Sequence, residues 1–219
     1  ANLAVEPAMT REECERAILT GVEVVGELVS QGYRLLATGE MGIGNTTTSA
    51  AVAAVLLGRD PEEVTGRGAG LSTEGLRRKV DAIRRGIACN QPNPSDPVDT
   101  VSKVGGLDIA GLAGVFLGGA LYHVPVLIDG FISSVSALVA ARLCPAALDY
   151  MLASHASNEP AGQMVLKALG LEPFLYAKMC LGEGTGAVAV MPLLDMGVAM
   201  YRDMSSFDDY QIDAYEHLT

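Results

Sequence analysis

Short apolar segments that end in glycine or acidic turns, each followed by a helical pattern, constrain the fold of this chain most strongly. Residues 124–128 (VPVLI) are apolar throughout and end in Asp129 and Gly130. Residues 33–38 (YRLLAT) end in the glycine-rich turn 39–44. A strand that is apolar at every position is typical of a sheet covered on both faces, and strands that alternate with helices predict parallel pairing. The sequence therefore predicts an α/β protein with a parallel sheet and a helical appendage.

Capping residues mark the expected helices. Thr10 and Glu13 have the spacing of a capping box, which opens a helix reaching about residue 31. Asp60 precedes Pro61 and Ser72 precedes a long polar helix, so both are expected to be N-caps. Further helices are expected over residues 46–57, 72–90, from about 131, and from the turn 181–186 (LGEGTG) to about 200. The acidic and partly aromatic residues 207–219 are expected to dock on the surface.

The charge of the chain restricts its partners. Its 219 residues include 15 basic and 26 acidic side chains, a net charge of −11. Nucleic acid and anionic membranes both require a basic face, so neither is an expected partner. Residues 109–128 lack formal charges over about the length of a membrane span. Because His123 and Pro125 interrupt this stretch, we favour a buried helix, a turn and a core strand over a span.

The cysteines and the first residues bear on the compartment. Four cysteines are scattered without CxxC spacing, so neither a disulfide framework nor a zinc site is indicated, and no histidine or carboxylate motif suggests another metal. The first residues show no basic region followed by an apolar run, so no signal peptide is predicted. Free, mostly buried thiols and the absence of a leader predict a cytoplasmic protein.

The turn within residues 38–49 (TGEMGIGNTTTS) joins a predicted strand to a helix. Small residues let the backbone approach a ligand, and N–H groups at a helix start bind anions. Neither phosphate fingerprint fits, because Thr47 stands where the dinucleotide motif has glycine and no GK[ST] occurs. A tight turn without a ligand therefore stays open as an interpretation. Glu40 favours a ligand, since a carboxylate at the tip of a buried strand is costly unless it accepts hydrogen bonds, for instance from sugar hydroxyls.

Lys79 lies in the basic helical segment 77–85 (RRKVDAIRR). A solvated helix face explains four of the five basic side chains, while one inward lysine could neutralise a phosphate. The pattern does not select Lys79 for that role.

Glu183 stands between Gly182 and Gly184 in apolar surroundings. Loss of hydration would raise the pKa of its carboxyl toward neutrality, which suits a general base near pH 7. A carboxylate at a helix N-terminus would instead have its pKa lowered by the helix dipole. The residues alone leave these two interpretations evenly balanced.

Residues 154–159 (SHASNE) predict a loop that enters a helix, with Ser157 or Asn158 as the cap. A Ser–His hydrolase is disfavoured because no GxSxG elbow occurs. A Rossmann oxidoreductase would need a ribose-binding acid about twenty residues past the glycine turn. Asp60 has roughly that spacing, but its place in a helix cap argues against this role.

Six ordered segments together resemble one family, the nicotinate-nucleotide–dimethylbenzimidazole phosphoribosyltransferases. The match extends from about residue 8 to about residue 205, and six motifs in order are far more specific than any one alone. The segments are GEMGIGNTTTSAA (39–51), the turn 66–70 with RRKVDAIRRGIACNQPNP (77–94), VSKVGGLDIAGLAGVFLGGA (101–120), VPVLIDGFISSVSAL (124–138), SHAS (154–157) and LGEGTGAVAVMP (181–192).

The resemblance implies transfer of a phosphoribosyl group from nicotinate mononucleotide to 5,6-dimethylbenzimidazole or a related base, with inversion at the anomeric carbon. The products are α-ribazole 5′-phosphate and nicotinate, used in cobamide assembly, and no metal or organic cofactor is implied. It also implies a Rossmann-like parallel α/β domain, a small helical domain and a homodimer with sites near the interface. We expect the α/β catalytic domain over 1–205 and a segment of the small domain over 206–219.

Matched residue by residue, the resemblance assigns the catalytic base to Glu183, which shifts the balance above toward catalysis. It places Glu40 against the ribose. Binding roles near the substrate are also implied for Gly42, Gly44 and Asn45 in the first turn, for Gly68, Lys79 and Ser157 near the phosphate, and for Gly130, Leu181 and Gly182 in the nucleotide pocket.

Family members begin with an N-terminal portion to which nothing here corresponds. That portion includes part of the small domain, the first strands and an apolar pocket for the benzimidazole. We therefore expect a truncated chain or a short form that needs a partner, with reduced activity when isolated. The alternative function is a non-catalytic nucleotide- or base-binding paralogue or partner subunit.

Overall fold

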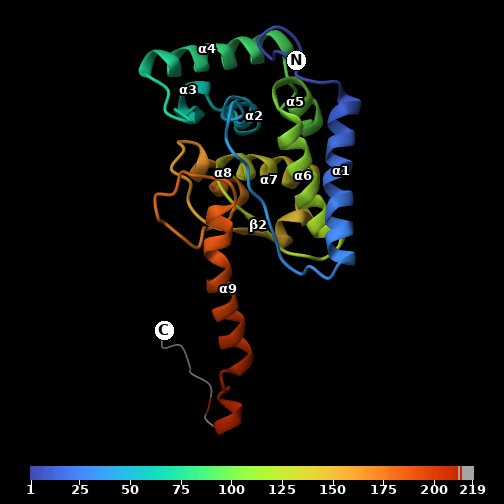
Figure 1. The fold of residues 1–219 in the computed structure, drawn as a ribbon, viewed down its shortest axis with the longest axis vertical. Helices are drawn as coiled ribbons and strands as arrows, with labels where there is room; N and C mark the ends of the chain where they lie inside the picture. Colours follow the sequence, from blue (N-terminus) through green and yellow to red (C-terminus); the bar gives the residue numbers. More distant parts are fainter. Residues whose placement is uncertain (212, 214–219) are drawn as a thin grey trace.

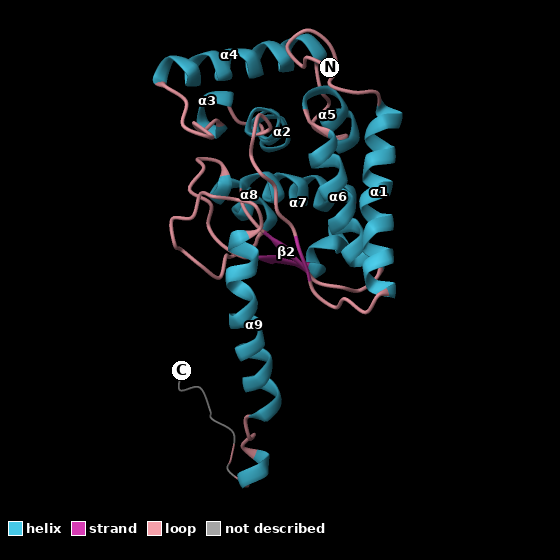
Figure 2. Cartoon of the chain, viewed as in Figure 1, coloured by secondary structure: helices cyan, strands magenta, loops and turns pink. Residues whose placement is uncertain are grey.

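A three-stranded parallel sheet forms the centre of the computed structural model, which describes residues 1–211 and 213 (Figure 2). Its strands are β1 (Leu36–Ala37), β2 (Val126–Ile128) and β3 (Met151–Ala153), in the order β1-β2-β3. Leu36 pairs with Val126, which pairs in turn with Met151. The parallel α/β prediction is confirmed. The strands are shorter than the apolar segments 33–38 and 124–128, because only part of each segment pairs with a neighbour.

Side chains of β2 point alternately into two apolar layers. Val126 and Ile128 belong to the main core, whereas Leu127 packs with Ala187 and Val190 of α9 (Thr185–Asp203). Because successive strand residues face opposite sides, a uniformly apolar strand requires cover on both faces. Helix α9 supplies that cover on the second face.

The predicted caps and helix boundaries are largely confirmed. Thr10 and Glu13 form both hydrogen bonds of the capping box, and Asp60 and Ser72 accept backbone N–H groups as N-caps. Gly32 follows Gln31, the C-cap of the first helix, and has φ +98°. The helices are α1 (Arg11–Ser30), α2 (Thr46–Leu57), α3 (Pro61–Val64), α4 (Thr73–Asn90), α5 (Pro97–Val104), α6 (Leu107–Leu121), α7 (Phe131–Leu143) and α8 (Gly162–Leu169), with short 3-10 turns at Pro145–Tyr150 and Asp208–Tyr210.

Helices α1 and α6 lie side by side along one edge of the molecule (Figure 1). A methyl group on Gly21 would overlap the carbonyl of Gly111, and one on Gly114 would overlap the carbonyl of Ile18. The two backbones therefore touch, which only glycine allows. The uncharged stretch 109–128 comprises most of α6, the turn at His123 (φ 56°) and β2, as expected. No helix among the described residues is long and apolar enough to cross a membrane.

The distal half of α9 projects away from the rest of the molecule (Figure 1). It exposes large apolar side chains, among them Met196, Val198 and Tyr201. Phe207 and Tyr210 beyond it are 56% and 68% exposed. The expected docking of residues 207–219 is therefore wrong for these two side chains, because α9 carries them away from the core. Residues 212 and 214–219 of that segment lie outside the described part.

Candidate active site

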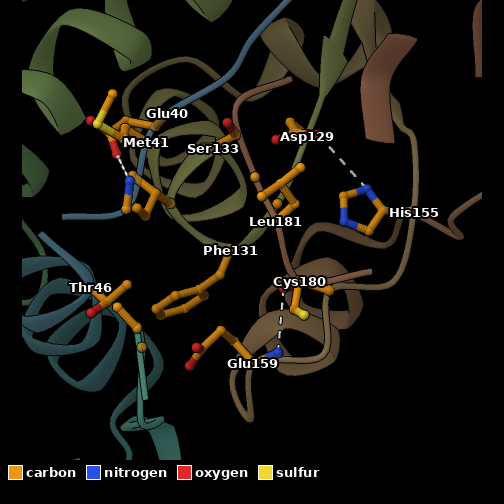
Figure 3. A pocket seen from close by; sticks show the side chains of 17 residues that line it. Glu40, Met41, Thr46, Asp129, Phe131, Ser133, His155, Glu159, Cys180 and Leu181 are labelled. Carbon is orange, nitrogen blue, oxygen red and sulfur yellow. Dashed lines mark hydrogen bonds and ion pairs between the residues drawn. The ribbon is translucent and has the colours of Figure 1, made fainter. Parts of the chain in front are cut away.

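A pocket opens at the carboxyl ends of the three strands, where ligands bind in open α/β sheets. Thr38 follows β1, Asp129 follows β2, and Ser154 and His155 follow β3. The turns of the chain that cover this edge of the sheet complete the wall (Figure 3). Seven of the residues assigned by the resemblance line the pocket: Glu40, Gly42, Gly68, Gly130, Ser157, Leu181 and Gly182.

Four assigned residues lie outside that wall. Gly44 has φ +85° in the turn before α2, and Asn45 donates its side-chain amide to Asp108 Oδ2 at 2.7 Å. Lys79 lies behind the wall, and Glu183 lies at its edge, next to Gly182. The structure thus gives Asn45 a role in holding the turn to α6, which the sequence did not suggest.

Two turns far apart in the sequence are joined at the pocket. The backbone N–H of Glu183 donates to the carbonyl oxygen of Glu40 at 2.9 Å. The carboxylate of Glu40 accepts the backbone N–H of Gly42, which orders the first turn. Glu40 therefore has the hydrogen-bond donor that a carboxylate at a strand tip requires, and this donor comes from its own turn.

The turn that carries Glu183 has an unusual backbone. Gly182, Glu183 and Gly184 have φ of 79°, 58° and 80°, so three consecutive residues adopt the left-handed region. For a residue with a side chain this conformation costs about 1–2 kcal/mol. Such backbone outliers persist only where the surrounding structure imposes them, and they cluster at functional sites.

The expected loss of hydration at Glu183 is not observed. The residue is exposed, as are Met41 and Leu181 at the edge of the pocket, at 62% and 66%. The apolar neighbours in sequence, Ala187 and Val190, point under the sheet instead of around the carboxylate. Glu183 nevertheless lies beside the turn 39–45, because its backbone N–H donates to the carbonyl oxygen of Glu40.

Lys79 is the inward-facing cation of helix α4. Its side chain is 7% exposed, whereas Arg77, Arg78, Arg84 and Arg85 are all exposed. The ammonium group donates to Thr46 Oγ1 at 2.9 Å and to the carbonyl of Gly66 at 3.0 Å. Burial lowers the pKa of Lys79, and the nearby carboxylate of Glu159 opposes that shift. The expectation of four solvated cations and one inward cation is confirmed.

Helix α2 begins beside Lys79. Its N-cap, Asn45, makes no capping hydrogen bond with its side chain. The first N–H groups of a helix lack partners within the helix and carry a partial positive charge. Thr46, the first residue of α2, lines the pocket, and its hydroxyl accepts a hydrogen bond from the Lys79 ammonium. A helix start and a buried cation thus meet at one end of the pocket, which suits an anion.

Sequence reasoning missed Asp129. Its side chain is 2% exposed and accepts the backbone N–H groups of Gly184, Gly186 and Ala187 at 3.0, 2.9 and 3.2 Å. From the sequence, Asp129 was interpreted only as part of a turn, and the resemblance gave a binding role to the neighbouring Gly130. An acidic residue directly after a buried strand was the available signal, but its partners lie in α9 and the turn before it.

His155 lies against Asp129 (Figure 3). Its Nδ1 is 4.0 Å from Asp129 Oδ1 and 3.0 Å from Ser154 Oγ. Burial lowers the pKa of His155, and the Asp129 carboxylate opposes that shift. A hydrolase triad requires serine on one ring nitrogen and the carboxylate on the other. Here the same nitrogen faces both, and Ser154 is fully buried, so the geometry excludes the hydrolase.

The structure decides the expected cap within residues 154–159 and the possible ribose-binding role of Asp60. Helix α8 begins at Gly162, and its N-cap Ala161 makes no side-chain cap, so neither Ser157 nor Asn158 caps it. Ser157 accepts the N–H of Glu159 and lines the pocket instead. Asp60 caps α3 and pairs with Arg84 at 2.8 Å, outside the pocket wall. This removes the ribose-binding acid that an oxidoreductase would need.

Of the four free cysteines, Cys14 alone is buried, so the expectation of mostly buried thiols is wrong. Cys180 is exposed and lines the pocket, and Cys89 is exposed elsewhere. Within residues 1–211 and 213, the histidines, cysteines and acidic residues form no group of three or more that could hold a metal ion.

Comparison with known proteins gives one consistent result. A family model described as phosphoribosyltransferase matches residues 1–212. A protein of Ruminiclostridium cellulolyticum named nicotinate-nucleotide–dimethylbenzimidazole phosphoribosyltransferase is 50% identical over 217 residues, covering 99% of this chain and 62% of that protein. The protein of the same name from Escherichia coli is 46% identical over 203 residues, covering 93% of this chain and 56% of its own length.

Solved structures agree with the sequence relatives. The crystal structure of CobT from Thermus thermophilus matches with a TM-score of 0.91 and 44% identity, covering 98% of this chain and 64% of that one. This chain therefore spans about three fifths of the length of the relatives it matches.

Proposed function

Because this chain belongs to the nicotinate-nucleotide–dimethylbenzimidazole phosphoribosyltransferase family, we propose that it transfers a phosphoribosyl group from nicotinate mononucleotide to a benzimidazole-type base. The observation that carries the proposal is the junction of the Glu40 and Glu183 turns at the mouth of the pocket. The products are nicotinate and an α-ribazole 5′-phosphate, which serve the assembly of the nucleotide loop of a cobamide.

The Glu183 carboxylate acts as the general base. It accepts the proton from one ring nitrogen of the azole while the lone pair of the other nitrogen forms the new bond to the ribose C1′. The bond from C1′ to the pyridinium nitrogen breaks, and its electron pair leaves with nicotinate. This leaving nitrogen becomes neutral and needs no acid. The protein therefore contributes mainly orientation and base catalysis.

The nucleotide binds along the wall from α2 to the Glu40 turn. The start of α2 and the buried Lys79 ammonium attract the phosphate, with Gly68 and Ser157 alongside. Glu40 accepts hydrogen bonds from the ribose hydroxyls. Gly42, Gly44 and Asn45 shape the turn that carries Glu40, and Gly130, Leu181 and Gly182 border the nucleotide.

The aromatic base lies across the exposed edge of the pocket. Met41 of the first turn and Leu181 of the second are exposed there, at 62% and 66%. A flat apolar base that covers these side chains also removes water from the exposed Glu183. The carboxylate thus loses hydration when the substrate arrives, and water no longer competes with the azole N–H for its oxygens.

The full-length gene product tests this function in an assay of nicotinate mononucleotide with 5,6-dimethylbenzimidazole. Formation of α-ribazole 5′-phosphate is followed by chromatography. Glu183→Gln should lower kcat by roughly 10²- to 10⁴-fold, the usual contribution of a general base. The matched control is Glu172→Gln, which changes an exposed glutamate just after α8 and should keep full activity.

Equal rates for Glu183→Gln and the wild type would contradict the role of Glu183 as the general base. Nucleotide binding without turnover would favour the non-catalytic paralogue.

We also propose two further features that the resemblance implies. The first is an α/β catalytic domain over residues 1–205, and the second is a homodimer. The apolar side chains that the distal part of α9 exposes support an assembly that covers them. Light scattering on the full-length gene product should give twice the mass of one chain. The free cysteines support the cytoplasm as its compartment.

A further inference from the structure

We propose that Asp129 is a positioning residue that holds the turn 182–184, and with it Glu183, in the conformation required for proton transfer. The inference rests on the proposed function, because it assigns the base to Glu183. Its observational basis is independent: a buried carboxylate on the central strand uses both of its oxygens to bind the backbone around Glu183.

Both oxygens of Asp129 are committed to backbone N–H groups. Oδ2 accepts from Gly184 at 3.0 Å, and Oδ1 accepts from Gly186 and Ala187 at 2.9 and 3.2 Å. Asp129 is also only 2% exposed, so its carboxylate is less accessible to a substrate than that of the exposed Glu183. It follows β2, the central strand of the sheet, so its position is fixed by a rigid element.

The turn needs an external restraint. Three consecutive residues, 182–184, have positive φ, and the non-glycine in the middle is Glu183 itself. The N-cap of α9 is Gly184, which has no side chain to cap the helix. Charge-assisted bonds from a carboxylate to helix-terminal N–H groups are among the stronger hydrogen bonds in proteins. Asp129 supplies such bonds to the last left-handed residue and to the first turn of α9.

Two other contacts confine the same segment. A methyl group on Gly186 would overlap the ring of His155, so the imidazole lies against the first turn of α9. A methyl group on Gly39 would lie 2.5 Å from the Gly184 nitrogen. The start of α9 is therefore in contact with both His155 and Gly39, and Asp129 fixes its direction.

The substitution Asp129→Asn tests the role in the full-length gene product. Asparagine keeps one acceptor oxygen but places an NH₂ group against one of the N–H donors, so part of the restraint is lost. A misplacement of about 1 Å can lower a rate by about 10²-fold. We expect kcat to fall by about that factor while the calorimetric affinity for nicotinate mononucleotide is unchanged.

A double-mutant cycle separates positioning from a general structural effect. If Asp129 acts through Glu183, Asp129→Asn should cause no further loss of rate in a Glu183→Gln background. An equal fold-loss in both backgrounds would overturn the proposal. If Asp129→Asn does not fold, Asp129→Glu takes its place, because glutamate keeps the carboxylate but displaces its oxygens by one methylene group.

Hydrogen exchange provides a readout that does not need activity. The amides of Gly184, Gly186 and Ala187 should exchange faster in Asp129→Asn, and unchanged exchange would refute the role. The matched control is Asp96→Asn, because Asp96 caps α5 through the N–H groups of Val98 and Asp99. That variant should lower Tm yet keep kcat. A wild-type protein without transferase activity would refute the proposed function, whereas the exchange result would still decide whether Asp129 holds the turn.

Discussion

The backbone N–H of Glu183 donates to the carbonyl oxygen of Glu40 at 2.9 Å. The two glutamates that the sequence singled out thus belong to turns that touch through their backbones, and neither side chain takes part in this contact. Close approach of the turns depends on Gly39, which packs against the backbone of Glu183 and Gly184.

The substitution Gly39→Ala should separate the two turns. Its methyl group would lie 2.5 Å from the Gly184 nitrogen, and backbone atoms there cannot give way as a flexible side chain could. We expect a loss of about 1–3 kcal/mol in the free energy of unfolding, measured in urea, together with lower transferase activity. The control is Gly197→Ala in α9, where a methyl group meets nothing within 4 Å. Gly197→Ala should leave the free energy of unfolding unchanged or raise it. If Gly39→Ala were as stable as the wild type, the close contact between the two turns would not be required for stability.

Replacing Lys79 by methionine should weaken nucleotide binding more than it slows turnover. Lys79 lies behind the pocket wall and donates to Thr46 and Gly66, so it acts on the phosphate through its charge and through these two residues. A hydrogen bond to a charged group contributes about 1.5–3 kcal/mol, so we expect the Kd for nicotinate mononucleotide to rise by at most roughly 10- to 100-fold. Calorimetry measures this directly. Arg77→Met removes an exposed cation from the same helix and should have little effect. Equal affinities for Lys79→Met and the wild type would exclude Lys79 as the phosphate's counter-charge.

Stability should fall on mild acidification because of His155. Burial lowers the pKa of His155 in the folded protein below its ordinary value of 6.5. As pH falls below about 6.5, the unfolded chain therefore binds a proton that the folded chain does not. The free energy of unfolding should decrease through this window, down to the folded pKa. The His155→Asn variant should lack this component of the slope in urea titrations at several pH values. An identical slope in the variant would show that His155 does not contribute.

Thiol labelling should report on occupancy of the pocket. Cys180 is exposed and lines it, whereas Cys89 is exposed elsewhere. Iodoacetamide should therefore modify both in the free protein, and nicotinate mononucleotide should slow the reaction at Cys180 alone. Burial raises the pKa of Cys14 to about 11, so this thiol should react only after unfolding. Mass spectrometry of the peptides distinguishes the sites, and equal protection of Cys89 would indicate a general conformational effect.

The sequence by itself determined the local structure and the family. The capping box of Thr10 and Glu13 and the N-caps Asp60 and Ser72 are hydrogen bonds between near neighbours, so a few residues specify each helix start. The uniformly apolar segment 124–128 required cover on both faces, wherever that cover came from. The six ordered motifs identified the relatives without any knowledge of how the motifs meet.

The tertiary structure decided which side chains are buried and which groups meet. Lys79 points inward and its four neighbouring arginines do not, because the orientation of α4 against α2 selects one face of the helix. Hydration of Glu183 depends on what packs around the turn and not on the apolar residues beside it in sequence. The hydrogen-bond partners of Asp129 lie at the start of α9, so its role depends on the packing of α9 against the end of β2. Contacts between distant segments set burial and hydrogen-bond partners, and neither local composition nor periodicity encodes those contacts.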